Sequence, residues 1–297
     1  MKNKKNNVKK ILPIAAFVLM FFMGLAIILY PTVSNIINQK GQSQAIKNYE
    51  QSISEASSSE IDYEYQKAVE YNENLAGDPV HDPFVYGSGY ALPKNYTSVL
   101  NINGDGIMGY IRIPEINVEL PIYHGTSDET LAVGIGHIES TSLPIGGMGT
   151  HSVLTGHSGL SNATLFTNLP RLKVGDNFYI TTLNKTFAYE VDSIKTVLPE
   201  DVSSLVAEPD KDCVTLITCT PYSVNTHRLL VHGVRVEYSG DPDEITELAS
   251  SLKWYEKISI TEISLIAGLS LVLIVIIIIT VILLPHRKRK NRSGDGK

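Results

Sequence analysis

The sequence predicts a mostly β domain held between two membrane-spanning helices. Short runs of strand-forming residues alternate with turn signals across residues 97–240, and two long apolar runs, 11–30 and 263–284, lie near the ends of the chain. Many short strands bounded by turns favour a closed or partly closed antiparallel sheet. An uncharged run of about 20 residues is long enough to cross the hydrocarbon core of a bilayer as a helix.

The basic tails predict the orientation of both spans. Residues 1–10 contain five lysines and no acid, and residues 285–297 follow the second apolar run with a dense series of Arg and Lys. By the positive-inside rule both tails are cytoplasmic, so the chain is a two-pass protein of the cell membrane with its central domain outside. A cleaved signal peptide is the alternative for 11–30, although the run is long for one and no small-residue cleavage site follows.

The net charge of −6 conceals a division of charge. Each tail carries a charge of +5, which leaves −16 for residues 11–284. A nucleic-acid partner would require a basic face on the central domain, so we predict none.

Two segments separate the first span from the β domain. Residues 31–76 have apolar residues at helical spacing with a break near Ser57–Ser59, which predicts a helical stalk of two amphipathic helices. Residues 77–96 are rich in Gly, Pro and aromatic residues, which predicts a long loop able to dock on the domain.

The β domain is predicted from seven strand-like runs within residues 97–240. The segment 101–106 resembles the start of a calcium loop, but Arg112 stands where an acid is required, so we interpret it as a turn and predict no metal or other cofactor. Asp241 and Pro242 begin a predicted helical connector, 241–262. The runs are 107–113, 118–123, 152–154, 177–182, 187–194, 214–218 and 229–238.

The only two cysteines, Cys213 and Cys219, flank the strand-like run 214–218. In a single strand their Cα atoms would be about 20 Å apart, too far for a disulfide. Cys219 ends the strand and precedes Thr220 and Pro221, a placement typical of catalytic groups, although a buried cysteine can equally act as a small hydrophobic residue. Cys213 is predicted to be such a core residue.

A nucleophilic thiol needs a base or a cation nearby. His157, in a glycine-flanked turn, is one candidate base, and His227 and His232 are others; composition does not choose between them. Arg228 opens the last strand, where it could supply an oxyanion donor or be an ordinary edge charge.

Four motifs in this chain resemble those of the sortases of Gram-positive bacteria, most closely the pilus-assembling class C. The first two motifs are contiguous and specific, and the others are short. They are Thr-Leu-x-Thr-Cys at 215–219, Thr-Pro-Tyr-x-x-Asn-Thr-His-Arg at 220–228, Thr-Gly-His at 155–157 and Asp-Pro-Phe at 82–84.

The resemblance implies an eight-stranded sortase β-barrel with short helices, in which His157, Cys219 and Arg228 form the catalytic triad. Cys219 would attack the Thr–Gly carbonyl of an LPXTG-like sorting signal, His157 would protonate the leaving amine, and Arg228 would stabilise the oxyanion. A lysine of the next pilin subunit would then resolve the thioacyl enzyme.

The resemblance also implies a lid, formed by Asp82, Pro83 and Phe84. Asp82 would pair with Arg228 and Phe84 would cover Cys219.

Two alternatives stay open. A sortase could instead anchor surface proteins to peptidoglycan, and a non-catalytic membrane-tethered β domain would have Cys219 merely buried.

Overall fold

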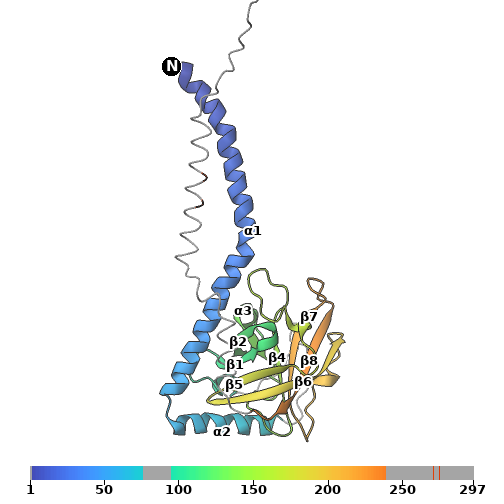
Figure 1. The fold of residues 1–297 in the computed structure, drawn as a ribbon. Coiled ribbons are helices and arrows are strands. Elements are labelled where there is room, and N and C mark those ends of the chain that lie inside the picture. The colour runs from blue at the N-terminus through green and yellow to red at the C-terminus, as the bar shows by residue number, and fades with distance from the viewer. Residues whose placement is uncertain (1, 76–94, 239–269, 271–273, 275–297) are drawn as a thin grey trace, which may run out of the picture. The chain divides into compact units, whose positions relative to one another are not determined.

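The computed structural model of the chain describes residues 2–75, 95–238, 270 and 274 (Figure 1). Within these residues eight strands form a closed barrel in the order β1-β2-β3-β4-β7-β8-β6-β5, which confirms the predicted eight-stranded fold. The strands are β1 Ile107–Ile113, β2 Val118–His124, β3 Ile135–His137, β4 Thr150–Thr155, β5 Asn177–Thr182, β6 Lys185–Val197, β7 Asp212–Thr220 and β8 His227–Val236.

The barrel is not wholly antiparallel, and in this respect the sequence prediction was wrong. The pairs β2–β3 and β4–β7 are parallel, whereas the other neighbouring strands run antiparallel. Parallel neighbours require a crossover connection. The helix α3, Asp128–Val133, lies in the first crossover, and β5 and β6 form the second. With only three residues, β3 is too short for its periodicity to be visible in the sequence.

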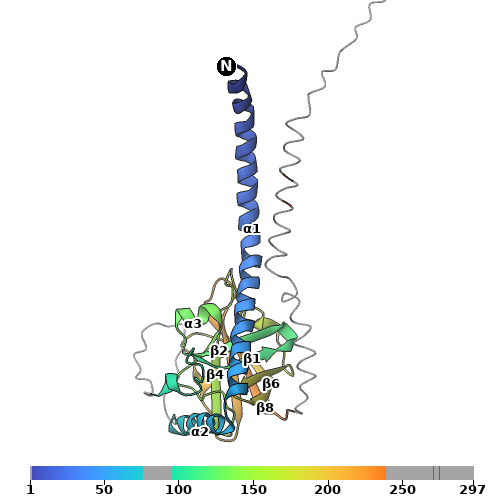
Figure 2. The same ribbon diagram turned by 90° about the vertical axis from the view of Figure 1, so that its left-hand side faces the viewer.

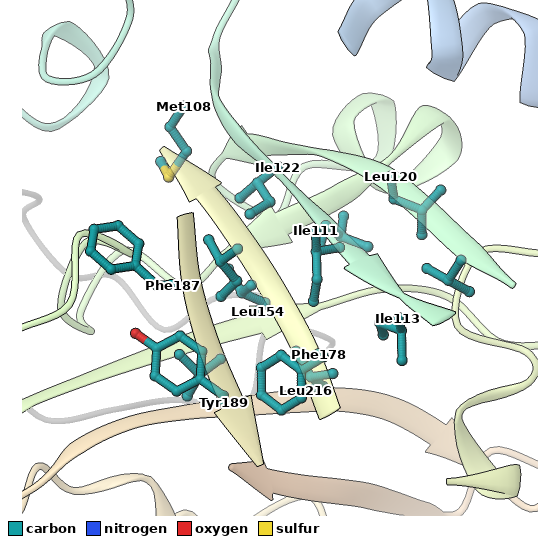
Figure 3. Close-up of a cluster of buried hydrophobic side chains, with 14 of the residues drawn as sticks. Met108, Ile111, Ile113, Leu120, Ile122, Leu154, Phe178, Phe187, Tyr189 and Leu216 are labelled. Carbon is teal, nitrogen blue, oxygen red and sulfur yellow. The ribbon is translucent and has the colours of Figure 1, made fainter. Parts of the chain in front are cut away.

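The barrel interior contains the main hydrophobic core. Phe178 and Tyr189 stack there with ring centroids 5.5 Å apart, and Figure 3 shows them beside aliphatic side chains from several strands. A second, smaller cluster lies on the other face of β7, because Ile217 alternates with the core residue Leu216. This outer cluster consists of Ile138, Val153, Leu205, Ile217 and Leu230.

Two helices precede the barrel, α1 Lys2–Glu55 and α2 Ser58–Asn74, and they confirm the predicted break. Ser57 caps α2 in a capping box with Glu60, which satisfies two backbone N–H groups at the helix start. Three short 3₁₀ helices lie in the loops of the barrel, at Pro114–Ile116, Leu169–Arg171 and Ser203–Leu205, and another, Tyr96–Ser98, precedes β1.

The second half of α1 packs against the barrel, which a simple stalk would not do. It runs beside β1 and β2 (Figure 2). Tyr49 is buried, donates a hydrogen bond to the Met108 carbonyl at 3.1 Å and accepts one from the Leu183 amide at 2.7 Å. Residues 35–49 of α1 are therefore part of the packing of the β domain.

The structure bears only in part on the membrane prediction. Within the described residues, one helix is long and apolar enough to span a bilayer; it lies near the N-terminus, where a signal sequence would have the same character. The predicted second span, 263–284, lies outside the described residues except for residues 270 and 274, and the connector 241–262 lies wholly outside them.

Candidate active site

The barrel brings Cys219 and Arg228 together at the end of the β7–β8 pair. The two residues are direct partners in the antiparallel register, so their side chains project from the same face with Cα atoms about 4.5–5.5 Å apart. Cys219 is 8% exposed and Arg228 is 7% exposed. Cys219 forms no disulfide, and it lies near the end of β7 with an arginine as its partner on β8.

The loop between these two residues orients the arginine. Pro221 accepts hydrogen bonds from the amides of Val224 and Asn225, both at 3.0 Å, which folds the connection into a tight turn. Arg228 Nη1 donates to the carbonyls of Asn225 and His227, both at 3.2 Å. These bonds fix the guanidinium against the loop that follows Cys219.

His157 follows β4, the strand that pairs with β7 on the side opposite β8. Strand β4 runs parallel to β7 with Thr155 opposite Ile217, and the Gly156 amide continues the ladder by donating to the Ile217 carbonyl at 3.1 Å. The buried hydroxyl of Thr218 donates to the Gly156 carbonyl at 2.7 Å. The ladder ends at the pair Thr155–Ile217, and His157 and Cys219 each follow two residues later on their own segments.

The surroundings of His157 favour its neutral form. Burial lowers the pKa of His157 below its ordinary value, and the carboxylate of Asp128 opposes this shift. A half-buried imidazole that is neutral at pH 7 can accept a proton from a thiol and then donate it as an imidazolium ion.

The other histidines in the described part of the chain have different surroundings. His227 pairs with Thr220 and so faces away from Cys219, because successive strand residues alternate. His232 lies opposite Thr215 and pairs with Asp192. His124 bonds the carbonyls of Gly106 and Val99. Burial lowers the pKa of His137 to about 3 and that of His151 to about 4.

The face of β7 that bears Cys219 changes character along the strand. Beside the thiol lies the apolar outer cluster, to which Ile217 and Leu230 belong. Further along, Thr215 and His232 line a polar cavity of about 450 Å³. Ile217 and Leu230 are only 2% and 3% exposed, because they pack with Leu205 of the 3₁₀ helix Ser203–Leu205.

Sequence reasoning missed three residues in contact with His157 or with the segment around it: Asp128, Thr218 and Tyr222. Tyr222 is 63% exposed, and its ring packs against Gly159, where an added Cβ would meet a ring carbon at 3.2 Å. Thr218 lies within the motif at 215–219, which was the one available signal. Asp128 lies far from that motif in sequence and left no signal.

Other predicted features are not tested by the structure. Asp82, Pro83 and Phe84 lie outside the described residues, so the lid remains a sequence prediction. In the described ranges, no group of three or more His, Cys, Asp or Glu side chains could hold a metal ion. The segment 101–106 is a turn, closed by a hydrogen bond from the Gly104 amide to the Asn101 carbonyl.

Comparison with known proteins gives consistent matches. Residues 111–236 match the family model described as the sortase domain. Sortase A of Streptococcus agalactiae is 30% identical over 159 residues, which span 52% of this chain and 63% of that protein's length.

Two solved structures extend the similarity. The crystal structure of sortase C-1 from Actinomyces oris has 51% sequence identity and a TM-score of 0.57, with 60% of this chain and 99% of that chain covered. A pilus-related sortase C of Group B Streptococcus has 43% identity and a TM-score of 0.60, with 65% and 98% covered.

Proposed function

Because the chain belongs to the sortase family, we propose that it is a class C cysteine transpeptidase that polymerises pilin subunits. It would cleave an LPXTG-like sorting signal between Thr and Gly and join the acyl group to a pilin lysine. The pilus-related sortase C structures among its similar proteins support this class.

One observation carries the proposal. Cys219 and Arg228 are opposite each other in the β7–β8 register, and Gly156, which precedes His157, is hydrogen-bonded to Ile217 and Thr218 of β7. A nucleophile, a base and a cationic donor on rigid strand ends are the parts that acyl transfer requires. We assign these roles to Cys219, His157 and Arg228 respectively.

In the acylation half-reaction, neutral His157 accepts the proton of the Cys219 thiol as sulfur attacks the Thr carbonyl carbon. The developing oxyanion accepts a hydrogen bond from the Arg228 guanidinium, which is worth most in a site shielded from water. The imidazolium then donates its proton to the Gly nitrogen as the C–N bond breaks. The products are a Cys219 thioester and a free Gly amine.

In the second half-reaction, a neutral lysine amine attacks the thioester carbonyl. His157 accepts a proton from the attacking nitrogen, the C–S bond breaks, and the sulfur regains a proton through the imidazolium. The product is an isopeptide bond, and no cofactor is needed because the proton that Cys219 lost to the Gly amine is replaced by the one taken from the lysine.

The apolar outer cluster is part of the framework behind the thiol. Ile217 and Leu230 lie on the same face as Cys219, one alternate position along β7 and β8. They are 2% and 3% exposed, so they support the strand ends that carry Cys219 and Arg228.

The lid is part of the proposal on sequence grounds alone. Asp82 would pair with Arg228, and Phe84 would cover Cys219 until substrate displaces them. Replacing both Asp82 and Phe84 should then speed modification of Cys219 by a polar thiol reagent. An unchanged rate would count against the lid.

The function is tested by incubating the purified full-length protein in detergent with a sorting-signal peptide. Mass spectrometry should detect a thioester on Cys219, and Cys219→Ala should give none. Absence of the adduct in the wild-type protein would favour a non-catalytic domain.

Acceptor choice separates the two kinds of sortase. Given a purified pilin and a peptidoglycan stem peptide together, the enzyme should form isopeptide-linked pilin. Transfer mainly to the stem peptide would show a cell-wall anchoring sortase and overturn the pilus assignment.

A further inference from the structure

We propose that Asn35 in α1 is a positioning residue for the loop that carries His157, so that the start of the ectodomain helix forms part of the active-site scaffold. This inference rests on the proposed role of His157. It goes further by assigning a catalytic contribution to a helix that sequence reasoning treated as a stalk.

The contacts between α1 and the loop are specific. Asn35 Oδ1 accepts hydrogen bonds from both the amide and the hydroxyl of Thr164, each at 2.9 Å. One turn later, Asn38 Nδ2 donates to the Asn162 carbonyl at 2.6 Å. Between them Ile36 is 9% exposed. Three hydrogen bonds therefore join two segments more than 120 residues apart in sequence.

The loop can transmit this restraint to His157 because it is closed on itself. The Phe166 amide donates to the His157 carbonyl at 3.1 Å, and the Gly159 amide donates to the Thr167 hydroxyl at 3.0 Å. Phe166 is fully buried, and Ala163 is 3% exposed. Thr164, the residue that Asn35 binds, thus lies between the buried Ala163 and the residues Phe166 and Thr167, which hydrogen-bond to His157 and Gly159.

The opposite side of the loop is fixed by β7, through the bond from Thr218 to the Gly156 carbonyl. That bond precedes His157 in sequence, whereas the bonds from Asn35 follow it. The backbone of His157 is consequently held from both directions, by a barrel strand and by α1. Small displacements of a catalytic group can cost up to about 100-fold in rate, so loss of one support should be measurable.

Asn35 lies close to the end of the predicted membrane span. Tyr30 ends the apolar run, and Asn35 follows five residues later, which corresponds to about 7.5 Å along a helix axis. The first turns of α1 beyond the predicted span are therefore those that hold the His157 loop. The segment that would anchor the protein and the segment that positions its base are continuous.

The chain offers matched variants for a test. Asn35→Ala removes the acceptor for Thr164, whereas Asn35→Asp retains an oxygen in the same place. Asn48→Ala is the control, because Asn48 is exposed on the same helix and its side chain accepts a hydrogen bond from Gln44. All are studied as full-length protein in detergent micelles with a sorting-signal peptide.

Two measurements are made on each variant: hydrogen exchange at the Thr164 amide, and the kcat and KM of peptide cleavage. Asn35→Ala should raise exchange at Thr164 at least about tenfold and lower kcat by about tenfold, with KM within about twofold. Asn35→Asp and Asn48→Ala should resemble the wild type in both measurements.

Exchange and kcat unchanged in Asn35→Ala would overturn the inference. So would an equal loss in Asn35→Asp, because the acceptor oxygen would then not be what matters. A wild-type protein that forms no thioester would instead sink the proposed function, and the exchange measurement would still show whether Asn35 holds the loop.

Discussion

The two ends of β7 carry the same pair of residue types and differ in what surrounds them. Cys213 lies opposite His151 in the β4–β7 register, and the same register continued by six residues would bring His157 opposite Cys219. The two cysteines also share a face of the strand, since they are an even number of residues apart. A histidine is thus in register with Cys213, and another, His157, follows the last β4–β7 pair at the Cys219 end.

The two ends differ in the neighbour on β8 and in burial. Cys213 faces Val234, whereas Cys219 faces Arg228. Cys213 is 2% exposed, and burial, together with the nearby carboxylate of Glu208, raises its thiol pKa to about 11. His151 bonds the Thr215 hydroxyl at 2.8 Å and the Val206 carbonyl at 3.2 Å. A Cys–His neighbourhood alone does not make a nucleophile; the arginine and the open strand end complete it.

The largest difference between the two ends of β7 should appear when each cysteine is replaced in turn. Cys219→Ala should lower acyl transfer by roughly 10⁴-fold or more, as the loss of a nucleophile does in other acyl-transfer enzymes. Cys213→Ala should keep activity within about twofold and cost about 1 kcal/mol of stability. Peptide cleavage and thermal unfolding measure the two effects. Comparable activity losses in both variants would contradict the division of roles.

A second test compares the two arginines of β8. Arg228→Gln should lower kcat by about 10²- to 10³-fold, because an oxyanion donor is lost. Arg235 lies near the Cys213 end, where Nη1 is 3.4 Å from Asp212 and the guanidinium covers the ring of Phe187. Arg235→Gln should leave kcat within about threefold and lower the free energy of unfolding by roughly 1–3 kcal/mol. An activity loss in Arg235→Gln as large as that in Arg228→Gln would refute the contrast.

Much of this arrangement could be predicted from the sequence, because the strongest sequence signals are local. The β-branched run before Cys219 predicts a strand end, and Arg228 nine residues later predicts a hairpin partner. The pairing of β4 with β7 could not be predicted from periodicity, since a parallel pair joins segments about 60 residues apart. For the same reason the choice of His157 came from family resemblance, and the contact between Asn35 and Thr164 was not foreseen.

The two ends of β7 can also be compared without mutation, by measuring how fast each thiol is alkylated. The Cys213 thiol, with a pKa of about 11, is only about one part in 3,000 thiolate at pH 7.5. Iodoacetamide at pH 7.5 should therefore label Cys219 at least about 100-fold faster than Cys213, as followed by peptide mass spectrometry. Unfolding in urea should make the two rates similar. Faster labelling of Cys213 in the folded protein would contradict its burial.

The smallest expected effect concerns the charge near His157. Catalysis requires the neutral imidazole to accept the thiol proton, so activity should fall as pH drops through the pKa of His157. Burial lowers that pKa below 6.5, which places the acidic limb of kcat/KM below pH 6.5.

Asp128 raises the pKa of His157, so Asp128→Asn should move this limb to still lower pH. Glu129→Gln, which removes the next carboxylate of α3, is the control and should leave the limb unmoved. Asp128 is exposed, and mobile ions screen such interactions, so about 1 M salt should reduce the difference between Asp128→Asn and the wild type. A shift to higher pH in Asp128→Asn would mean that Asp128 does not act on His157 through its charge. No shift at low salt would mean that the environment of His157, unlike that of Cys213, is set by burial alone.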